Sequence, residues 1–359
     1  MADLKSPGQG FAGIVSDDAS RAFAEALPRL LTLVNDKFSV DARLFSRFTP
    51  ERLLLLSDAH EHFGKMLRAV LEFSLYEHML DEFRWYVSSL SSRGLGEEYF
   101  LRMVEGWIIA IHAALAPVEA REVSRPLEWL ALNSRAVYRL RRSAGAPLGS
   151  AGSQFLALLL GRKRRDAVGY VLDLIRSGEN IERVITDVIL RAMGEVGRLW
   201  EANEISVSDE HAATEISRYA IQRLMEELAR EKPLGLTAVV GCVPGEQHDI
   251  GALLTAGYFE AKGWDVVYLG RSTPEKDLIE TVARGRPQVC VFSITLIARL
   301  PASRDLFMKI RESVPGTKIV AGGHAAEIAS VTLSQYVDAV ARTIREANEV
   351  ALKLVRRNA

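Results

Sequence analysis

Three ionisable residues lie within one short segment in the C-terminal half of the chain. Glu246, His248 and Asp249 fall within four consecutive positions. A metal ligand fits this pattern best, because histidine is a common ligand and a carboxylate two residues away can orient its ring. A zinc site would need further ligands, and no Cys/His cluster lies nearby. The segment lacks the glycine patterns of phosphate-binding loops, and no nucleophile accompanies it for acid–base catalysis. Plain helix capping is the remaining alternative.

This segment falls between an expected strand and an expected helix. From residue 236 onward, β-rich apolar runs alternate with amphipathic stretches. We expect strands at 236–242, 265–269, 289–294 and 318–321, and helices at 248–262, 274–284, 303–313 and 339–356. Such alternation predicts a doubly wound parallel sheet over residues 235–359, an α/β domain whose ligands bind at the carboxyl ends of the strands.

The segment and two later positions resemble the D-x-H-x-x-G signature of cobalamin-binding Rossmann-like domains, with glutamate in the first place. The positions that carry the resemblance are Glu246, His248, Gly251, Ser293, Thr295, Gly322 and Gly323. The family's S-x-L is altered here to Ser-Ile-Thr-Leu. The resemblance implies that His248 is the lower cobalt ligand and that Ser293 and the glycine pair admit the cofactor's nucleotide tail. Taken alone, the glycine pair is also compatible with an ordinary turn.

Four amphipathic segments precede this domain, at 154–160, 164–177, 181–201 and 208–230. Their short polar connections predict an up-down four-helix bundle over residues 153–231. A Gly/Pro-rich stretch before it indicates a domain boundary.

The bundle contains Trp200, followed after nine residues by the pair Glu210-His211. This spacing resembles the helical cap of cobalamin-dependent photoreceptors of the CarH type. The resemblance implies adenosylcobalamin, with the three side chains around its adenosyl group. A histidine follows the tryptophan in the DNA-binding members, but Glu201 stands here, so the same bis-histidine light state cannot form. Taken alone, Trp200 would be an ordinary core residue and His211 a helix-surface residue.

Residues 19–142 contain one helical pattern after another, with aromatic and histidine residues inside apolar stretches. Their layout is similar to the globin-like, bilin-binding domain of photocobilins. We expect His78 and His112 to face a bilin such as biliverdin, and His60 and His62 to be solvated. The bilin would be noncovalent because Cys242 and Cys290 lie elsewhere. A dimerisation bundle with a filled interior is the alternative.

The overall composition excludes several classes of protein. The chain has 359 residues, with 45 Lys and Arg against 46 Asp and Glu. A net charge of −1 gives no electrostatic reason to bind nucleic acid or an anionic membrane. No apolar run approaches the roughly 20 residues of a membrane span. We therefore expect a cytoplasmic protein with buried, reduced cysteines and without a nucleic-acid or membrane partner.

Together these resemblances imply a non-enzymatic photoreceptor. Light would cleave the cobalt–carbon bond of adenosylcobalamin and change contacts between domains or subunits, with a bilin as second chromophore. The output would pass to a protein partner or to a second copy in a homo-oligomer. Two alternatives share the same cobalamin residues. One is a light-independent cobalamin- or redox-sensing regulator, and the other is a corrinoid methyl carrier.

Overall fold

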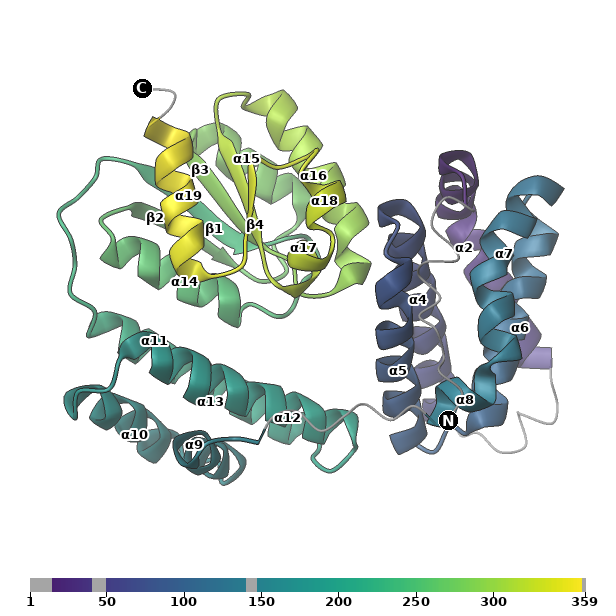
Figure 1. Cartoon of the computed structure of the whole chain (residues 1–359), viewed down its shortest axis with the longest axis horizontal. Coiled ribbons are helices and arrows are strands. Elements are labelled where there is room, and N and C mark those ends of the chain that lie inside the picture. Colours follow the sequence, from purple (N-terminus) through teal and green to yellow (C-terminus); the bar gives the residue numbers. More distant parts are fainter. Residues whose placement is uncertain (1–14, 41–49, 140–146, 357–359) are drawn as a thin grey trace. The chain divides into compact units, whose positions relative to one another are not determined.

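The structure, a computed structural model, describes residues 15–40, 50–139 and 147–356 (Figure 1). The expected boundary at 142 and the last three residues of the expected domain 235–359 lie outside these ranges. The contacts divide the chain into two compact units. The first contains the described residues up to 139 together with Leu296–Ala302 and Ile328–Leu333, and the second contains the rest.

The first unit is helical throughout its described N-terminal part. Its helices are α2 (Asp17–Val40), α4 (Pro50–Phe73), α5 (Tyr76–Ser92), α6 (Glu97–Ala114), α7 (Pro117–Leu132) and α8 (Ser134–Arg139). Residues 52–89 contain no proline and only one glycine, Gly64, yet they do not form one continuous helix. The chain turns at Ser74, whose φ is 55°. A non-glycine residue in that region is uncommon, so sequence patterns rarely reveal such a break.

Large aromatic side chains fill the interior of this unit. Phe63, Phe83, Phe100 and Trp107 are fully buried. The ring centres of Phe63 and Trp107 lie 5.7 Å apart, and those of Phe63 and Phe83 lie 5.3 Å apart. Gly64 makes room for this packing, since a Cβ there would lie 2.6 Å from the Trp107 ring. The interior is therefore built by close aromatic packing.

The second unit begins with the expected helical bundle. Its elements are α9 (Ser150–Leu160), α10 (Arg164–Arg176), α11 (Ile181–Arg183), the π-helical segment η1 (Val184–Leu190), α12 (Arg191–Glu201) and α13 (Val207–Glu226). Elements α11, η1 and α12 follow one another without a break, as the run 181–201 predicted. Ser206 and Asp209 form a capping box that fixes the start of α13.

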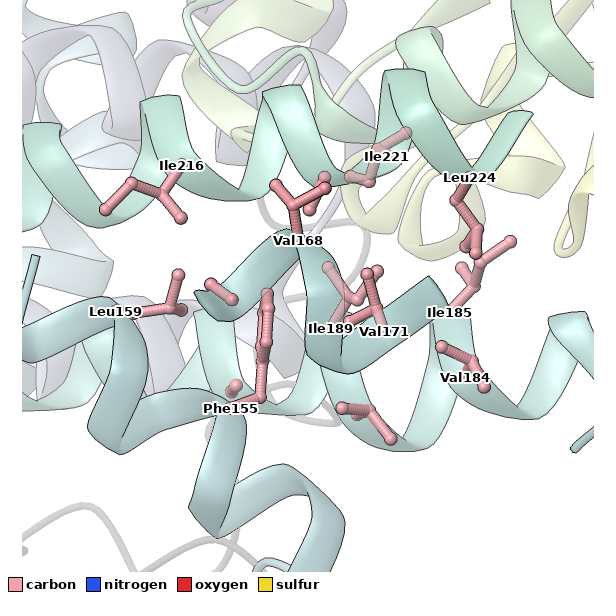
Figure 2. Close-up of a cluster of buried hydrophobic side chains, with 14 of the residues drawn as sticks. Phe155, Leu159, Val168, Val171, Val184, Ile185, Ile189, Ile216, Ile221 and Leu224 are labelled. Carbon is pink, nitrogen blue, oxygen red and sulfur yellow. The ribbon is translucent and has the colours of Figure 1, made fainter. Parts of the chain in front are cut away.

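One apolar core holds the bundle together and continues into the next domain. In Figure 2, Phe155, Val171 and Ile189 point toward one another from three different segments of the bundle. Leu253 and Leu254 belong to the same buried cluster, although they lie on α14 (Ile250–Ala261). The bundle is therefore packed directly on the helix that follows the Glu246–Asp249 loop.

A parallel sheet forms the rest of this unit, confirming the predicted α/β fold. Within the described residues the strands lie in the order β2-β1-β3-β4-β5. They are β1 (Thr237–Cys242), β2 (Asp265–Gly270), β3 (Val289–Ser293), β4 (Lys318–Gly322) and β5 (Ala339–Ala341). Helices cover both faces (Figure 1): α14, α15 (Glu275–Gly285), α16 (Leu300–Ser313) and α19 (Ile344–Arg356), with the short α17 (His324–Ile328) after β4. The short η2 (Ile297–Arg299) and α18 (Ser330–Leu333) lie in the two segments that belong to the first unit.

The expected final helix at 339–356 was partly wrong. Residues 339–341 form β5, which pairs with β4, and the helix begins only at Ile344. A three-residue strand of small side chains at a sheet edge is too short to show a period of two, so its pairing with β4 determines its conformation.

Candidate functional site

The strand register brings the predicted site residues together at one edge of the sheet. Cys242 at the end of β1 pairs with Ser293 at the end of β3, which in turn pairs with Gly322 at the end of β4. The loops that leave these three strands are therefore neighbours. From β1 the chain continues to β2 on one side, and from β2 it crosses to β3 on the other side of β1. The boundary between β1 and β3 is therefore the point where the strand order reverses. Such switch points are where ligands bind in open α/β sheets.

Glu246 is the organising residue of the first loop. The residue is fully buried. Its Oε1 accepts hydrogen bonds from the backbone N–H groups of Gln247 and His248. Oε2 accepts the backbone N–H of Thr295 at 2.9 Å, which joins the loop after β1 to the loop after β3. A buried carboxylate needs such donors to offset the loss of its hydration. Glu246 is therefore fixed in position by both loops.

The His248 ring is oriented by this carboxylate. Its Nδ1 lies 2.6 Å from Oε1 of Glu246, and its side chain is 56% exposed. An acidic partner at Nδ1 fixes the tautomer and makes the ring a better electron donor at its other nitrogen. A metal ligated by this ring would therefore bind through Nε2.

A cavity of about 530 Å³ lies at the same edge of the sheet, with a mainly apolar lining. Gly251, Ser293, Gly322 and Gly323 all line it, together with residues of β1, α14, α19 and the bundle. Gly323 has a φ of 97°, and a Cβ there would lie 2.5 Å from the carbonyl oxygen of Ile294. Only glycine fits at this position. The cavity gives an apolar ring system access to the sheet, which fits the nucleotide tail of a cobalamin. Thr295 contributes through its bond to Glu246.

The predicted cap residues lie at one end of the bundle, where α12 ends and α13 begins. Trp200 is half-buried, and Glu210 and His211 follow in the first turns of α13. Oε1 of Glu210 accepts a hydrogen bond from the Thr214 hydroxyl at 2.7 Å. Oε2 of Glu210 lies 3.6 Å from Nε2 of His211. The His211 side chain is largely exposed. Glu201, by contrast, is buried.

One histidine of the first unit, His60, is not placed as predicted. His112 is exposed and His78 is half-buried, each on its own helix. His60, expected to be solvated, is buried instead, and burial lowers the pKa of His60 and of His62 to about 4. The signal was present in the sequence, because Leu56, His60 and Phe63 share one face of a helix whose other members are apolar.

Two residues near the site escaped the sequence reasoning. His324 follows Gly323 directly and is exposed at the same sheet edge. Arg218 of α13 forms an ion pair with Asp249, the residue after His248. The position of His324 next to the glycine pair could have drawn attention to it, whereas no local pattern indicates Arg218.

Three broader features complete the description of the structure. In the described part of the chain, no three His, Cys, Asp or Glu side chains converge to hold a metal ion. Cys242 and Cys290 are both buried and free, as expected. Within the same ranges no helix is both long enough and apolar enough to cross a membrane.

Comparison with protein families identifies the cofactor class. Residues 236–355 match the model of a B12 binding domain, and residues 153–225 match a second model with the same description. The bundle and the sheet of the second unit are therefore B12-binding domains, and the cofactor is a cobalamin.

The individual relatives that match this chain have names of two kinds, a transcriptional repressor and corrinoid proteins. The HTH-type transcriptional repressor CarH of Myxococcus xanthus is 27% identical over 162 residues, 44% of this chain and 53% of that protein. The chain thus spans about half the length of CarH. Dimethylamine corrinoid protein 1 of Methanosarcina acetivorans is 24% identical over 168 residues, 45% of this chain and 78% of that protein. The solved monomethylamine corrinoid protein of Methanosarcina barkeri, 22% identical, covers 56% of this chain and 96% of its own with a TM-score of 0.50, which supports the fold.

Proposed function

We propose that this chain, which carries two B12-binding domains, is a non-catalytic light sensor that uses adenosylcobalamin. The observation that carries the proposal is the position of Trp200 and Glu210-His211 at one end of a bundle whose core continues into α14. That helix begins directly after the loop of His248. The side chains proposed for the upper and the lower face of a cobalamin thus belong to one compact unit. A change at the cap can reach the sheet through the core that the bundle shares with α14.

Different residues would bind different parts of the cofactor. Nε2 of His248 would coordinate cobalt, while Glu246 accepts the Nδ1 proton and keeps the ring in place. The glycine-lined cavity would receive the nucleotide tail. The Trp200 indole would enclose the upper group, and the Glu210 carboxylate would accept hydrogen bonds from ribose hydroxyls. When bound, adenosylcobalamin supplies a weak cobalt–carbon bond that visible light breaks. Loss of the upper group would then leave the cap side chains to repack.

The output of the sensor would be a change in self-association or in binding to a protein partner. The net charge of −1 gives the chain as a whole no electrostatic attraction to DNA. The expectation of no nucleic-acid partner nevertheless finds no support in the comparison with CarH, which is named a transcriptional repressor. DNA binding therefore belongs among the outputs to be measured. A cytoplasmic location also stays part of the proposal.

A bilin in the first unit rests on the resemblance to photocobilins alone. The fully buried Phe63, Phe83, Phe100 and Trp107 occupy its interior, and His112 is exposed. These observations favour the alternative of a structural or partner-binding bundle. Co-expression with a source of biliverdin separates the two, because a bound bilin would give the purified chain a red-absorbing band.

A corrinoid methyl carrier is the second candidate. It is favoured by the larger share of dimethylamine corrinoid protein 1 that the chain matches, 78% against 53% of CarH. A light-independent cobalamin-sensing regulator is the third. The cap distinguishes the first two, because an adenosyl group needs far more enclosed space above the corrin than a methyl group.

The test compares two cobalamins in the dark and after illumination. The purified chain should bind adenosylcobalamin more tightly than methylcobalamin, and light should change both its absorption spectrum and its hydrodynamic size. Trp200→Ala should keep cobalamin but reduce the preference for the adenosyl form, whereas Trp200→Phe should retain most of it. Equal affinity for the two cobalamins would favour the methyl carrier. A spectral change without any change in size or partner binding would contradict the sensor.

A further inference from the structure

A largely buried ion pair joins the cap to the loop that carries His248. Nη1 of Arg218, on α13, contacts Oδ2 of Asp249. The hydroxyl of Tyr268 donates to the same oxygen at 3.3 Å. The Asp249 side chain is 1% exposed and that of Arg218 is 20% exposed. Pairs with this degree of burial are sensitive to the loss of either partner, since an uncompensated charge is then left away from water.

The Asp249 carboxylate binds Arg218 and does not cap α14, the helix that begins directly after it. Asp249 is the N-cap residue of α14, where aspartate is favoured because its side chain can accept backbone N–H bonds. Here its side chain makes no capping bond. Its other oxygen, Oδ1, is buried without a partner among the described residues. The carboxylate thus forgoes the usual stabilisation of its own helix and is directed to Arg218 and Tyr268.

Helix α13 connects this ion pair to the cap. Glu210 and His211 lie in its first turns, and Arg218 follows eight positions after Glu210, about 12 Å along the axis at 1.5 Å per residue. The opposite partner, Asp249, is covalently adjacent to His248. One straight helix therefore carries the candidate upper-face residues and is anchored beside the candidate lower ligand.

We propose that Arg218 and Asp249 are positioning residues that fix the distance between α13 and the His248 loop. They would thereby set the space available to the upper ligand of cobalt. The proposal rests on the proposed function, because it assigns the upper-face role to Glu210 and His211. Neither member of the pair contacts the cobalt. The pair acts as a fixed anchor, so that loss of the upper group moves the N-terminal end of α13 while its middle stays attached to the loop.

The first test is a double-mutant cycle on cofactor choice in the full chain. Arg218→Gln and Asp249→Asn should each lower the ratio of adenosylcobalamin to methylcobalamin affinity about tenfold, within the range for residues that orient a metal site. The double variant should lose no more than either single one, because both changes break the same contact. Arg218→Lys keeps the charge and should recover part of the ratio. Arg223→Gln is the matched control, since Arg223 lies on the same helix in a surface pair with Glu226.

Equal loss of affinity for both cobalamins in the single variants would show a merely structural role and overturn the proposal. Additive losses in the double variant would also overturn it.

A second measurement needs no cofactor and separates this inference from the proposed function. Hydrogen exchange of the cobalamin-free chain should be faster in Arg218→Gln than in the wild type over α13 and residues 243–249, and unchanged over α15 on the other face of the sheet. If the wild type does not discriminate between the two cobalamins, the proposed function fails, and the exchange pattern still decides whether the pair anchors α13. Unchanged exchange in α13 would contradict the anchor directly.

Discussion

His60 in the first unit and His248 in the second are both held by hydrogen bonds, yet their settings are opposite. Nδ1 of His60 lies 2.7 Å from the Asn35 side-chain oxygen, and the Tyr99 hydroxyl lies 3.1 Å from Nε2. His60 is 1% exposed, whereas the His248 side chain is 56% exposed and its Nδ1 is engaged by Glu246. A buried ring with protein partners at both nitrogens serves the packing of its helices. An oriented, solvent-accessible ring can serve a ligand.

The surroundings of the two histidines extend this contrast. The Phe38 ring packs against His60, with ring centres 4.6 Å apart, and the interior nearby is aromatic. In the second unit the sheet edge leaves a cavity of about 530 Å³ lined partly by glycine, including Gly251, three residues after His248. The difference is one of exposure, because the His248 ring is oriented by one carboxylate and stays accessible, whereas the His60 ring is enclosed.

Replacing the exposed histidine should give the largest effect. His248→Ala should weaken cobalamin binding about 100-fold, or about 2.7 kcal/mol, because the cobalt loses its protein ligand while the tail cavity remains. Equilibrium dialysis against adenosylcobalamin in the dark measures this loss. His324→Ala is the control, since His324 is exposed at the same sheet edge. If the two variants bind alike, His248 is not the ligand.

Acid should destabilise the first unit through its buried histidine. The pKa of His60 is lowered from 6.5 to about 4 by burial, so the unfolded chain binds more protons between these values. Stability conferred by the neutral ring is therefore complete above pH 6.5 and is lost as pH falls toward 4. From pH 7 to pH 5 the free energy of unfolding should fall by about 2 kcal/mol, and His62 should add a change of the same sign.

Urea titrations at the two pH values, followed by hydrogen exchange in peptides of α4 and α6, report this unit separately. His60→Gln should make the pH dependence shallower. The same dependence in His60→Gln and in the wild type would mean that other groups control the acid sensitivity.

Neutralising the carboxylate behind His248 should have a smaller effect than removing the ring. Glu246→Gln should weaken cobalamin binding about tenfold, because an amide accepts the Nδ1 proton less strongly and no longer raises the basicity of the ring. Glu275→Gln, a change at a partly exposed carboxylate paired with Lys309 on α16 in the same unit, provides the control. Unchanged affinity in Glu246→Gln would show that this carboxylate binds the backbone of the two loops but does not tune the His248 ring.

The smallest effect concerns the other histidine. Tyr99→Phe should lower the free energy of unfolding by about 1 kcal/mol, because it removes one buried hydrogen bond to Nε2 of His60. It should leave cobalamin affinity unchanged. A weakened affinity would contradict the separation of the two regions, since it would tie the packing of His60 to the cofactor.

The sequence predicted the fold of the second unit well because its signals are local. Strand and helix periods gave four of the five strands in the described residues and the continuous run of α11, η1 and α12. The short strand β5 was missed because its conformation depends on pairing with β4. The break at Ser74 was missed because a positive φ at a serine leaves no trace in composition.

The site was predictable where its chemistry is contained in one loop. Glu246 and His248 are two residues apart, and their hydrogen bond was expected from that spacing. The bond from Thr295 to Glu246 spans 49 residues, and the pair Arg218–Asp249 spans 31. Both depend on how elements dock in three dimensions, which the sequence alone does not show. For the same reason His60 was placed in solvent, although its helix turns it inward.

The ligand assignment of His248 can be tested most directly by electron paramagnetic resonance of the chain loaded with cobalamin in its cobalt(II) state. Protein with ¹⁵N-labelled histidine is compared with unlabelled protein. A histidine ligand would split each cobalt line into a triplet with ¹⁴N and into a doublet with ¹⁵N, and we expect this change. We also expect no doublet from the labelled His248→Ala variant. A triplet that persists in the labelled wild type would mean that the nitrogen belongs to the cofactor's own base, which would contradict the assignment.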